Sequence, residues 1–332
     1  MQERLLFIIS PPRAGSTLLQ RMLGSHREIF THPEPHLITP LAYLGYYDLV
    51  DKAPYDHINA AEAMQLFVSR LPRGEADYLD ALRAYADTLY GRMLAPSGKR
   101  YFLDKTPAYT LVLPFLTRLY PRARYVVLTR HPLAVASSYA NSFFDGDWHA
   151  ANRFNPVVSR YVPAIARVLR DPPQHLCQIG YEDLVRDPRA ALSRVCSFLD
   201  LEFQPEMLSY GEHYTPAPGG RGDPIQVDQH TRAVDSFVDS WRSELARDAM
   251  KLAIAREIVD GLEPDDVRLW GYAHANLLPA ADGGAPARGP RRLNAFLLQR
   301  RIMLALKHNI RERPHGKLVQ RLRYYCNVLL RE

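Results

Sequence analysis

A run of five consecutive apolar residues, followed at once by a loop of small and polar residues, is the feature that most constrains the fold. Leu5–Ile9 has the unbroken hydrophobicity of a strand buried on both faces of a parallel sheet. The loop Ser10–Thr17 comes next, and apolar residues then recur at helical spacing as far as Gly24: Leu18, Leu19, Met22 and Leu23. The chain is therefore predicted to begin with a strand, a loop and a helix.

The same unit recurs further along the chain. A β-rich stretch at 124–129 is followed by a turn at 130–132 and a helix that begins near Leu133. A third strand is predicted at 175–181, with helix through Phe198, and residues 60–95 have helical periodicity. Strands that alternate with helices predict an α/β fold, with a P-loop-like, mainly parallel sheet flanked by helices.

The loop before the first helix has the chemistry of a phosphate site. Free backbone N–H groups at a helix N-terminus, together with the helix dipole, bind anions, and Gly15 lets the backbone come close to one. An ordinary N-capped helix is the alternative, in which Ser16 or Thr17 satisfies the first N–H groups. The loop lacks both the first glycine and the lysine of the Walker A motif, which disfavours a P-loop kinase or NTPase.

Three segments in order resemble the sulfotransferases that use 3′-phosphoadenosine-5′-phosphosulfate (PAPS), in particular the bacterial branch and the tyrosylprotein and secondary-metabolite enzymes. Pro12–Leu19 matches the loop that binds the 5′-phosphosulfate in this family. A strand ending in Arg130, with Ser138 eight residues later, matches the 3′-phosphate motif. The Tyr181–Leu184 segment is similar to the one that follows a later core strand. The resemblance covers roughly residues 5–275 and implies sulfuryl transfer from PAPS to an acceptor hydroxyl.

The resemblance implies a donor-binding set in two parts. Arg13 is expected on the sulfuryl or 5′-phosphate oxygens, and Arg130 and Ser138 on the 3′-phosphate. The open alternatives are a surface arginine near a turn for Arg13, and an Arg–carboxylate pair and a helix cap for the other two. The complete set is Arg13, Ala14, Gly15, Ser16, Thr17, Leu18, Arg130, Ser138 and Tyr181. Residues 214–232 are expected to be a loop, and its part from Gly219 to Thr231 is expected either to close as a flap over the nucleotide or to be an ordinary surface loop.

Catalytic roles follow from the same resemblance. Lys105 falls where related enzymes stabilise the leaving group; the alternative is a solvated lysine at a strand end. Glu34 falls on the base of the tyrosylprotein branch, and His36 falls on an arginine there. Two prolines predict an extended path that projects His32, Glu34 and His36 together. A histidine as base, or a purely structural cluster, stays open. Asp104 is expected either to orient the neighbouring lysine or to cap the turn before Pro107.

The charge is divided unevenly along the chain. The net charge is +6, but from Arg288 to the end the balance is +10, which leaves −4 for the first 287 residues. We expect a sulfotransferase domain at 1–277, a linker at 278–290 and a basic amphipathic helical tail at 291–332. The tail is predicted to pack on the body or another subunit, to lie on an anionic membrane surface, or to contact an acidic protein.

The remaining expectations concern partners and compartment. Three cysteines without metal-ligand spacing favour a reducing, cytoplasmic setting, and no metal is expected to be required. The acceptor is expected to carry a hydroxyl on a small molecule, a carbohydrate, a lipid or a carrier-bound chain. No nucleic acid is expected, because the positive charge is confined to the tail. Beside the kinase, the rival is a non-catalytic nucleotide-binding interaction protein that binds the product 3′,5′-ADP without turnover.

Overall fold

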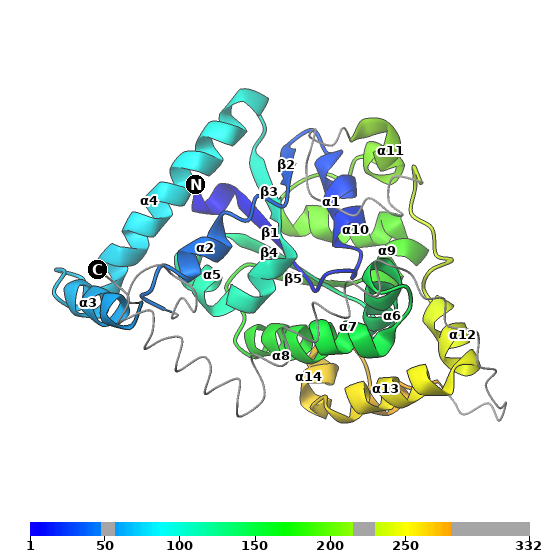
Figure 1. The fold of residues 1–332 in the computed structure, drawn as a ribbon. Helices are drawn as coiled ribbons and strands as arrows, with labels where there is room; N and C mark the ends of the chain where they lie inside the picture. The colour runs from blue at the N-terminus through cyan, green and yellow to red at the C-terminus, as the bar shows by residue number, and fades with distance from the viewer. Residues whose placement is uncertain (48–56, 215–229, 280–332) are drawn as a thin grey trace.

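Five parallel strands form a single sheet in the order β2-β3-β1-β4-β5 (Figure 1). The structure is a computed structural model that describes residues 1–47, 57–214 and 230–279. The strands are β1 Leu5–Ile9, β2 Ile29–Pro33, β3 Tyr101–Lys105, β4 Arg124–Thr129 and β5 Leu176–Gly180. The predicted fold class and the three predicted strands are therefore confirmed.

The first half of the chain contributes helices to both faces of the sheet. They are α1 Ser16–Gly24, α2 Ile38–Ala42, α3 His57–Ser69, α4 Glu75–Leu94, the 3₁₀ segment η3 Pro107–Val112 and α5 Leu113–Leu119. The helical prediction for 60–95 is confirmed, although a turn divides it into α3 and α4. Four of its apolar residues are exposed, because this part of α3 and α4 faces away from the core: Leu66, Phe67, Tyr85 and Leu89.

The second half adds helices around β4 and β5. They are α6 Pro132–Phe143, α7 Trp148–Phe154, α8 Val157–Arg170, α9 Tyr181–Arg186, α10 Pro188–Phe198, α11 Tyr210–His213, α12 Ser240–Arg247, α13 Ala249–Asp260 and α14 Pro264–Leu269. Short 3₁₀ segments complete the described chain: η1 Gln2–Arg4, η2 Ala95–Ser97, η4 Pro205–Ser209 and η6 His274–Asn276. The tail at 291–332 and the linker from residue 280 lie outside the described residues.

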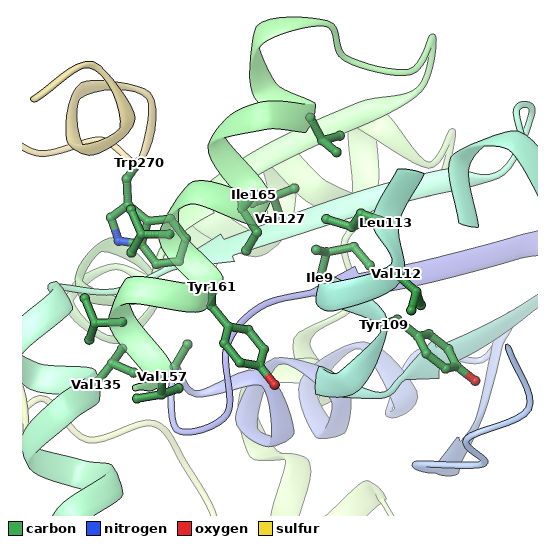
Figure 2. Close-up of a cluster of buried hydrophobic side chains, with 14 of the residues drawn as sticks. Ile9, Tyr109, Val112, Leu113, Val127, Val135, Val157, Tyr161, Ile165 and Trp270 are labelled. Atoms are coloured by element: carbon green, nitrogen blue, oxygen red, sulfur yellow. The ribbon is translucent and has the colours of Figure 1, made fainter. Parts of the chain in front are cut away.

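Alternating side chains of the strands feed two hydrophobic cores, one on each face of the sheet. On β1, Phe7 and Ile9 belong to the core that also contains residues of α5, α6 and α8, part of which Figure 2 shows. Leu6 and Ile8 belong to the opposite core, with residues of α1 and α10. Both faces of the sheet are covered, which explains why the central strand β1 is an unbroken apolar run. The carboxyl ends of the strands are therefore left as the edge at which polar side chains gather.

Candidate active site

The loop between β1 and α1 is shaped by two residues in the left-handed region. Arg13 has a φ of 71°, and Gly15, which caps the N-terminus of α1, has φ 92° and ψ 14°. A Cβ atom at position 15 would lie 2.4 Å from Cδ2 of the Tyr181 ring. Only glycine therefore meets both demands, the backbone conformation and the close packing of an aromatic ring. The first N–H groups of α1 are left facing the carboxyl edge of the sheet.

A pocket opens over this loop and is lined by residues far apart in the sequence. Eight of the nine predicted donor-binding residues line it, contributed by the loop and α1, by the end of β4, by α6 and by the start of α9. They are Arg13, Gly15, Ser16, Thr17, Leu18, Arg130, Ser138 and Tyr181. The ninth, Ala14, is fully buried in the hydrophobic core and does not line the pocket.

Arg130 brings a buried positive charge to this pocket. Its Nη1 donates to the carbonyl of Arg13 at 3.0 Å, and Nη2 donates to the carbonyl of Phe237 at 2.9 Å. The guanidinium carbon lies 4.2 Å from the centre of the Tyr181 ring, while Nε is buried without a partner. Burial lowers the pKa of Arg130. Among the described residues no carboxylate lies within ion-pair distance, so the Arg–carboxylate alternative is wrong. An unpaired buried guanidinium is suited to an anionic ligand.

Arg13 and Ser138 meet at the same pocket. Nε of Arg13 donates to Oγ of Ser138 at 3.3 Å, and the guanidinium also lies 5.9 Å from the Phe143 ring centre. This contact favours a role for Arg13 in the pocket over the alternative of a surface arginine near a turn. The family resemblance implies opposite ends of the donor for these two residues, whereas the structure joins them by a hydrogen bond.

Lys105 and Glu34 form a close pair beside the phosphate loop. Nζ of Lys105 lies 2.6 Å from Oε1 of Glu34 and 3.2 Å from Oγ1 of Thr17. Lys105 is only 1% exposed, so it is not the solvated lysine of the alternative. The pair forms because β2 and β3 run parallel and in register, with Pro33 opposite Lys105. A cation and a carboxylate thus lie next to a hydroxyl that lines the pocket.

The extended path expected for the two histidines and Glu34 is wrong. β2 ends at Pro33, and Glu34 and His36 then take left-handed conformations with φ 35° and 52°. The chain turns here instead of alternating. His36 still reaches Glu34, with Nε2 3.9 Å from Oε2. His32 stays on the strand, where its Nδ1 lies 3.1 Å from the carbonyl of Pro33.

The profile of the sulfotransferase family matches residues 6–205. The chain belongs to this family. The matched residues contain the phosphate loop, Glu34, Lys105, Arg130 and Ser138, so the family covers the whole predicted catalytic set. Membership supports sulfuryl transfer as the reaction of this sulfotransferase, and the P-loop kinase alternative is not favoured.

Similar proteins place the sulfotransferase among bacterial and animal enzymes. Nodulation protein NoeE of Sinorhizobium fredii is 29% identical over 308 residues, covering 85% of this chain and 69% of its own. A putative protein-tyrosine sulfotransferase of Caenorhabditis briggsae is 24% identical over 63% of this chain and 70% of its own. The solved sulfotransferase domain of the Synechococcus PCC 7002 olefin synthase is 26% identical, with a TM-score of 0.52 over 80% of this chain and 93% of that domain.

The pocket of the sulfotransferase also contains residues that sequence reasoning did not single out, apart from His230, which belongs to the expected flap. The segment around 230–237 lines the pocket through His230, Arg232, Ala233, Val234 and Phe237, together with Tyr210 of α11. This segment is tied to α11, because the N–H of Gly211 donates to the carbonyl of Thr231 at 3.1 Å. The earlier part of the expected flap, 219–229, lies outside the described residues. The signal available in the sequence was the position of Arg232 and Phe237 directly after that Gly- and Pro-rich stretch.

Within 1–47, 57–214 and 230–279, no group of three or more His, Cys, Asp or Glu side chains could hold a metal ion. In the same ranges, no helix has both the length and the apolar character needed to span a membrane.

Proposed function

We propose that this sulfotransferase uses PAPS as its donor and transfers the sulfuryl group to an acceptor hydroxyl by in-line displacement. The observation that carries the proposal is the pair of anion-binding features in one pocket: the glycine-capped N-terminus of α1, and the buried, unpaired guanidinium of Arg130. A donor with phosphate groups at both its 5′ and 3′ positions matches two such features, whereas a nucleoside monophosphate uses only one. The residues of the pocket therefore fit the donor, although its position is not part of the structure.

The proposed chemistry requires one bond to form and one to break. The acceptor oxygen bonds to sulfur, the bond from sulfur to the 5′-phosphate oxygen breaks, the hydroxyl proton passes to a base, and 3′,5′-ADP leaves. Glu34 is proposed as the base, since its carboxylate is the acidic group held beside the phosphate loop through Lys105. Lys105 is proposed to stabilise the negative charge that develops on the leaving oxygen. Its low exposure strengthens that interaction, because little water competes for the ammonium group.

His36 is the alternative base. Its Nε2 lies 3.9 Å from Oε2 of Glu34, beyond a direct hydrogen bond but in the same turn, and the imidazole is more exposed, at 45% against 19% for the carboxylate. The assignment to Glu34 rests on its direct contact with Lys105, which His36 does not share among the described contacts. The acceptor is proposed to be a hydroxyl on a carbohydrate, lipid, small metabolite, protein or carrier-bound chain.

The donor is tested by thermal denaturation with 3′,5′-ADP, 5′-AMP and ATP at equal concentrations. A ligand that binds only the folded protein raises its Tm by mass action, so 3′,5′-ADP is expected to give a shift of several degrees that the other two do not match. Ser138→Ala is the matched variant: it should lose most of the advantage of 3′,5′-ADP over 5′-AMP and keep the 5′-AMP shift. Equal shifts for all three nucleotides in the wild-type protein would contradict the donor assignment.

Turnover needs a second measurement, because tight binding of 3′,5′-ADP without transfer would favour a non-catalytic binding protein. ³⁵S-labelled PAPS is incubated with representatives of each acceptor class, and labelled products are separated from released sulfate. Transfer to one class identifies the acceptor chemistry. Absence of both transfer and sulfate release, in a protein that binds 3′,5′-ADP selectively, would leave the binding function and remove the enzymatic one.

A further inference from the structure

A buried hydrogen-bonded group lies directly behind the pair of Lys105 and Glu34. Asp104 precedes the lysine on β3 and is completely buried. Neighbouring residues on a strand point to opposite faces, so the carboxylate lies on the far side of the sheet from the ammonium group. It accepts hydrogen bonds from three hydroxyls: Tyr90 at 2.6 Å, Thr106 at 2.8 Å and Tyr109 at 3.0 Å.

Tyr109 extends this group to a different part of the chain. Its hydroxyl, which donates to Asp104, also accepts a hydrogen bond from the backbone N–H of Ile38 at 3.1 Å. Ile38 is the first residue of α2, directly after the turn that carries Glu34 and His36. In Figure 2 the ring of Tyr109 lies at the border of the apolar cluster, with its hydroxyl directed away from the other labelled side chains. The tyrosine therefore links the strand that bears Lys105 to the helix that follows Glu34.

The turn from Glu34 to Leu37 is strained and is held at both ends. Two non-glycine residues in the left-handed region are unfavourable and persist only where the surrounding structure fixes them. At the first end, Pro33 pairs with Lys105 across the two strands. At the second end, the N–H of Ile38 is fixed to Asp104 through Tyr109. The two contacts lead to consecutive residues of β3, the first to Lys105 and the second to Asp104.

We infer that Tyr109, anchored by Asp104, is a positioning residue that holds the Glu34 turn against Lys105. The inference rests on the proposed function, because it assigns Glu34 and Lys105 as the reacting pair. Tyr109 and Asp104 do not line the donor pocket, so they act through the turn and not on the donor. Burial raises the pKa of Asp104 to about 6, so the carboxylate is ionised and a strong acceptor above neutral pH. Burial also raises the pKa of Tyr109 above its usual range, which keeps its hydroxyl a donor.

Tyr90 supplies a matched control. Its hydroxyl donates to the same carboxylate oxygen of Asp104 and also contacts the hydroxyl of Tyr109, and the ring is as buried as that of Tyr109. Among the described contacts, however, no hydrogen bond joins Tyr90 directly to the backbone of the Glu34 turn. Tyr109→Phe and Tyr90→Phe each delete one oxygen atom and one hydrogen bond to Asp104. A role confined to stability predicts similar consequences for both variants. A positioning role predicts a difference in turnover.

The experiment compares the full-length chain with these two variants by sulfate release from ³⁵S-PAPS, with water as acceptor, and by transfer to whichever acceptor class the screen yields. Tyr109→Phe is expected to lower kcat at least tenfold, with KM for PAPS and the Tm shift by 3′,5′-ADP within twofold of wild type. Tyr90→Phe is expected to keep kcat within threefold. Equal losses in both variants, or no loss in Tyr109→Phe, would overturn the inference.

A second variant covers the case in which Tyr109→Phe does not fold. Asp104→Asn keeps the side-chain volume and leaves the tyrosine hydroxyl available to Ile38, but it removes the charged acceptor that anchors the tyrosine. The same loss of kcat with an unchanged KM for PAPS is expected, and a kcat within twofold of wild type contradicts the inference. Failure of the proposed donor has a different signature, because the selective Tm shift by 3′,5′-ADP would then be missing from the wild-type protein itself.

Discussion

At the scale of single residues, the site depends on charges that are placed before any ligand arrives. Arg130 is buried and bonded to two carbonyl oxygens, and Lys105 is buried against Glu34 and Thr17. Burying a charge is unfavourable unless it is paired or used. Lys105 is paired and Arg130 has no carboxylate in contact among the described residues, which makes the arginine the stronger indication of an anionic ligand.

Substituting Glu34 and His36 in turn tests which of the two residues is the base. Glu34→Gln keeps the shape of the side chain and removes its ability to take a proton, so transfer is expected to fall by about 10²–10⁴-fold while 3′,5′-ADP binding is retained. His36→Gln is the control at a neighbouring position, and its effect is expected to stay within tenfold, because the imidazole lacks the contact with Lys105. Radiolabelled transfer and thermal shift measure the two quantities. A larger loss of transfer in His36→Gln than in Glu34→Gln would assign the base to His36.

At the scale of elements, the sequence predicted what periodicity and short motifs determine locally. The strand at 5–9 has a continuous apolar pattern because both its faces are covered, and the strands at 124–129 and 176–180 are short β-rich stretches followed by a helix, which made them recognisable. The donor residues were predicted because the phosphate loop and the segment from Arg130 to Ser138 resemble two contiguous motifs of the sulfotransferase family. The extended path predicted at Glu34 was wrong because the conformation of this turn is fixed by distant partners, Lys105 and Tyr109. The spacing of residues along the chain does not predict such long-range contacts.

The exposed parts of α3 and α4 also show what local sequence patterns do not predict. Helical spacing of apolar residues predicted helix correctly, but it did not predict that Leu66, Phe67 and Tyr85 are exposed. The pocket wall at 230–237 was missed in part for a similar reason. Its residues lie together with the phosphate loop only after α11 has brought the chain back to the sheet edge.

Substituting Gly15 tests the role of the loop between β1 and α1. Gly15→Ala places a Cβ atom 2.4 Å from the Tyr181 ring in a backbone with φ 92°. Gly98→Ala is the control, since Gly98 is also left-handed, with φ 63° and ψ 3°, and its Cβ would meet nothing within 4 Å. The control is expected to lose about 1 kcal/mol of unfolding free energy from backbone conformation alone. Gly15→Ala is expected to lose more and to abolish the Tm shift by 3′,5′-ADP.

Urea denaturation measures the unfolding free energies, and thermal denaturation measures the ligand effect. Because the clash is with an aromatic ring, Gly15→Ala combined with Tyr181→Ala should recover part of the stability but not the ligand shift, since Tyr181 lines the pocket. Equal stability losses at positions 15 and 98, with ligand binding intact, would contradict the role of the glycine in this loop.

At the scale of the whole molecule, two buried groups make stability depend on pH in opposite directions. His131 stacks on Trp241 of α12, with ring centres 4.2 Å apart, so it joins the end of β4 to the C-terminal helices. Burial, with a smaller effect from Arg242, lowers the pKa of His131 to about 3. Asp104, in the β3 network, has its pKa raised to about 6 by burial. Each group binds protons differently in the folded and unfolded chain, and stability follows that difference.

The histidine favours the folded state at high pH. In the unfolded chain it takes up a proton as the pH falls through about 6.5, whereas the folded chain does not until about pH 3, so its contribution is lost as pH falls through this window. The aspartate acts in the other direction. The folded chain protonates it near pH 6 and the unfolded chain near 3.8, so its contribution is lost as pH rises from about 4 to 6. Between pH 4 and 6 the two contributions therefore oppose each other.

Substituting either His131 or Asp104 should reveal the pH dependence of stability that the other group contributes. His131→Phe keeps the stacking on Trp241 and removes two ring nitrogens that have no partner among the described residues. Relative to wild type, the unfolding free energy of this variant is expected to rise as pH falls from 6 to 4, with a slope difference approaching ~1.4 kcal/mol per pH unit, the value for one proton. Asp104→Asn is expected to show a slope difference of the opposite sign. Urea denaturation at pH 4.5, 5.5, 6.5 and 7.5 measures both, and parallel curves for all three proteins would show that neither group is buried as the structure describes.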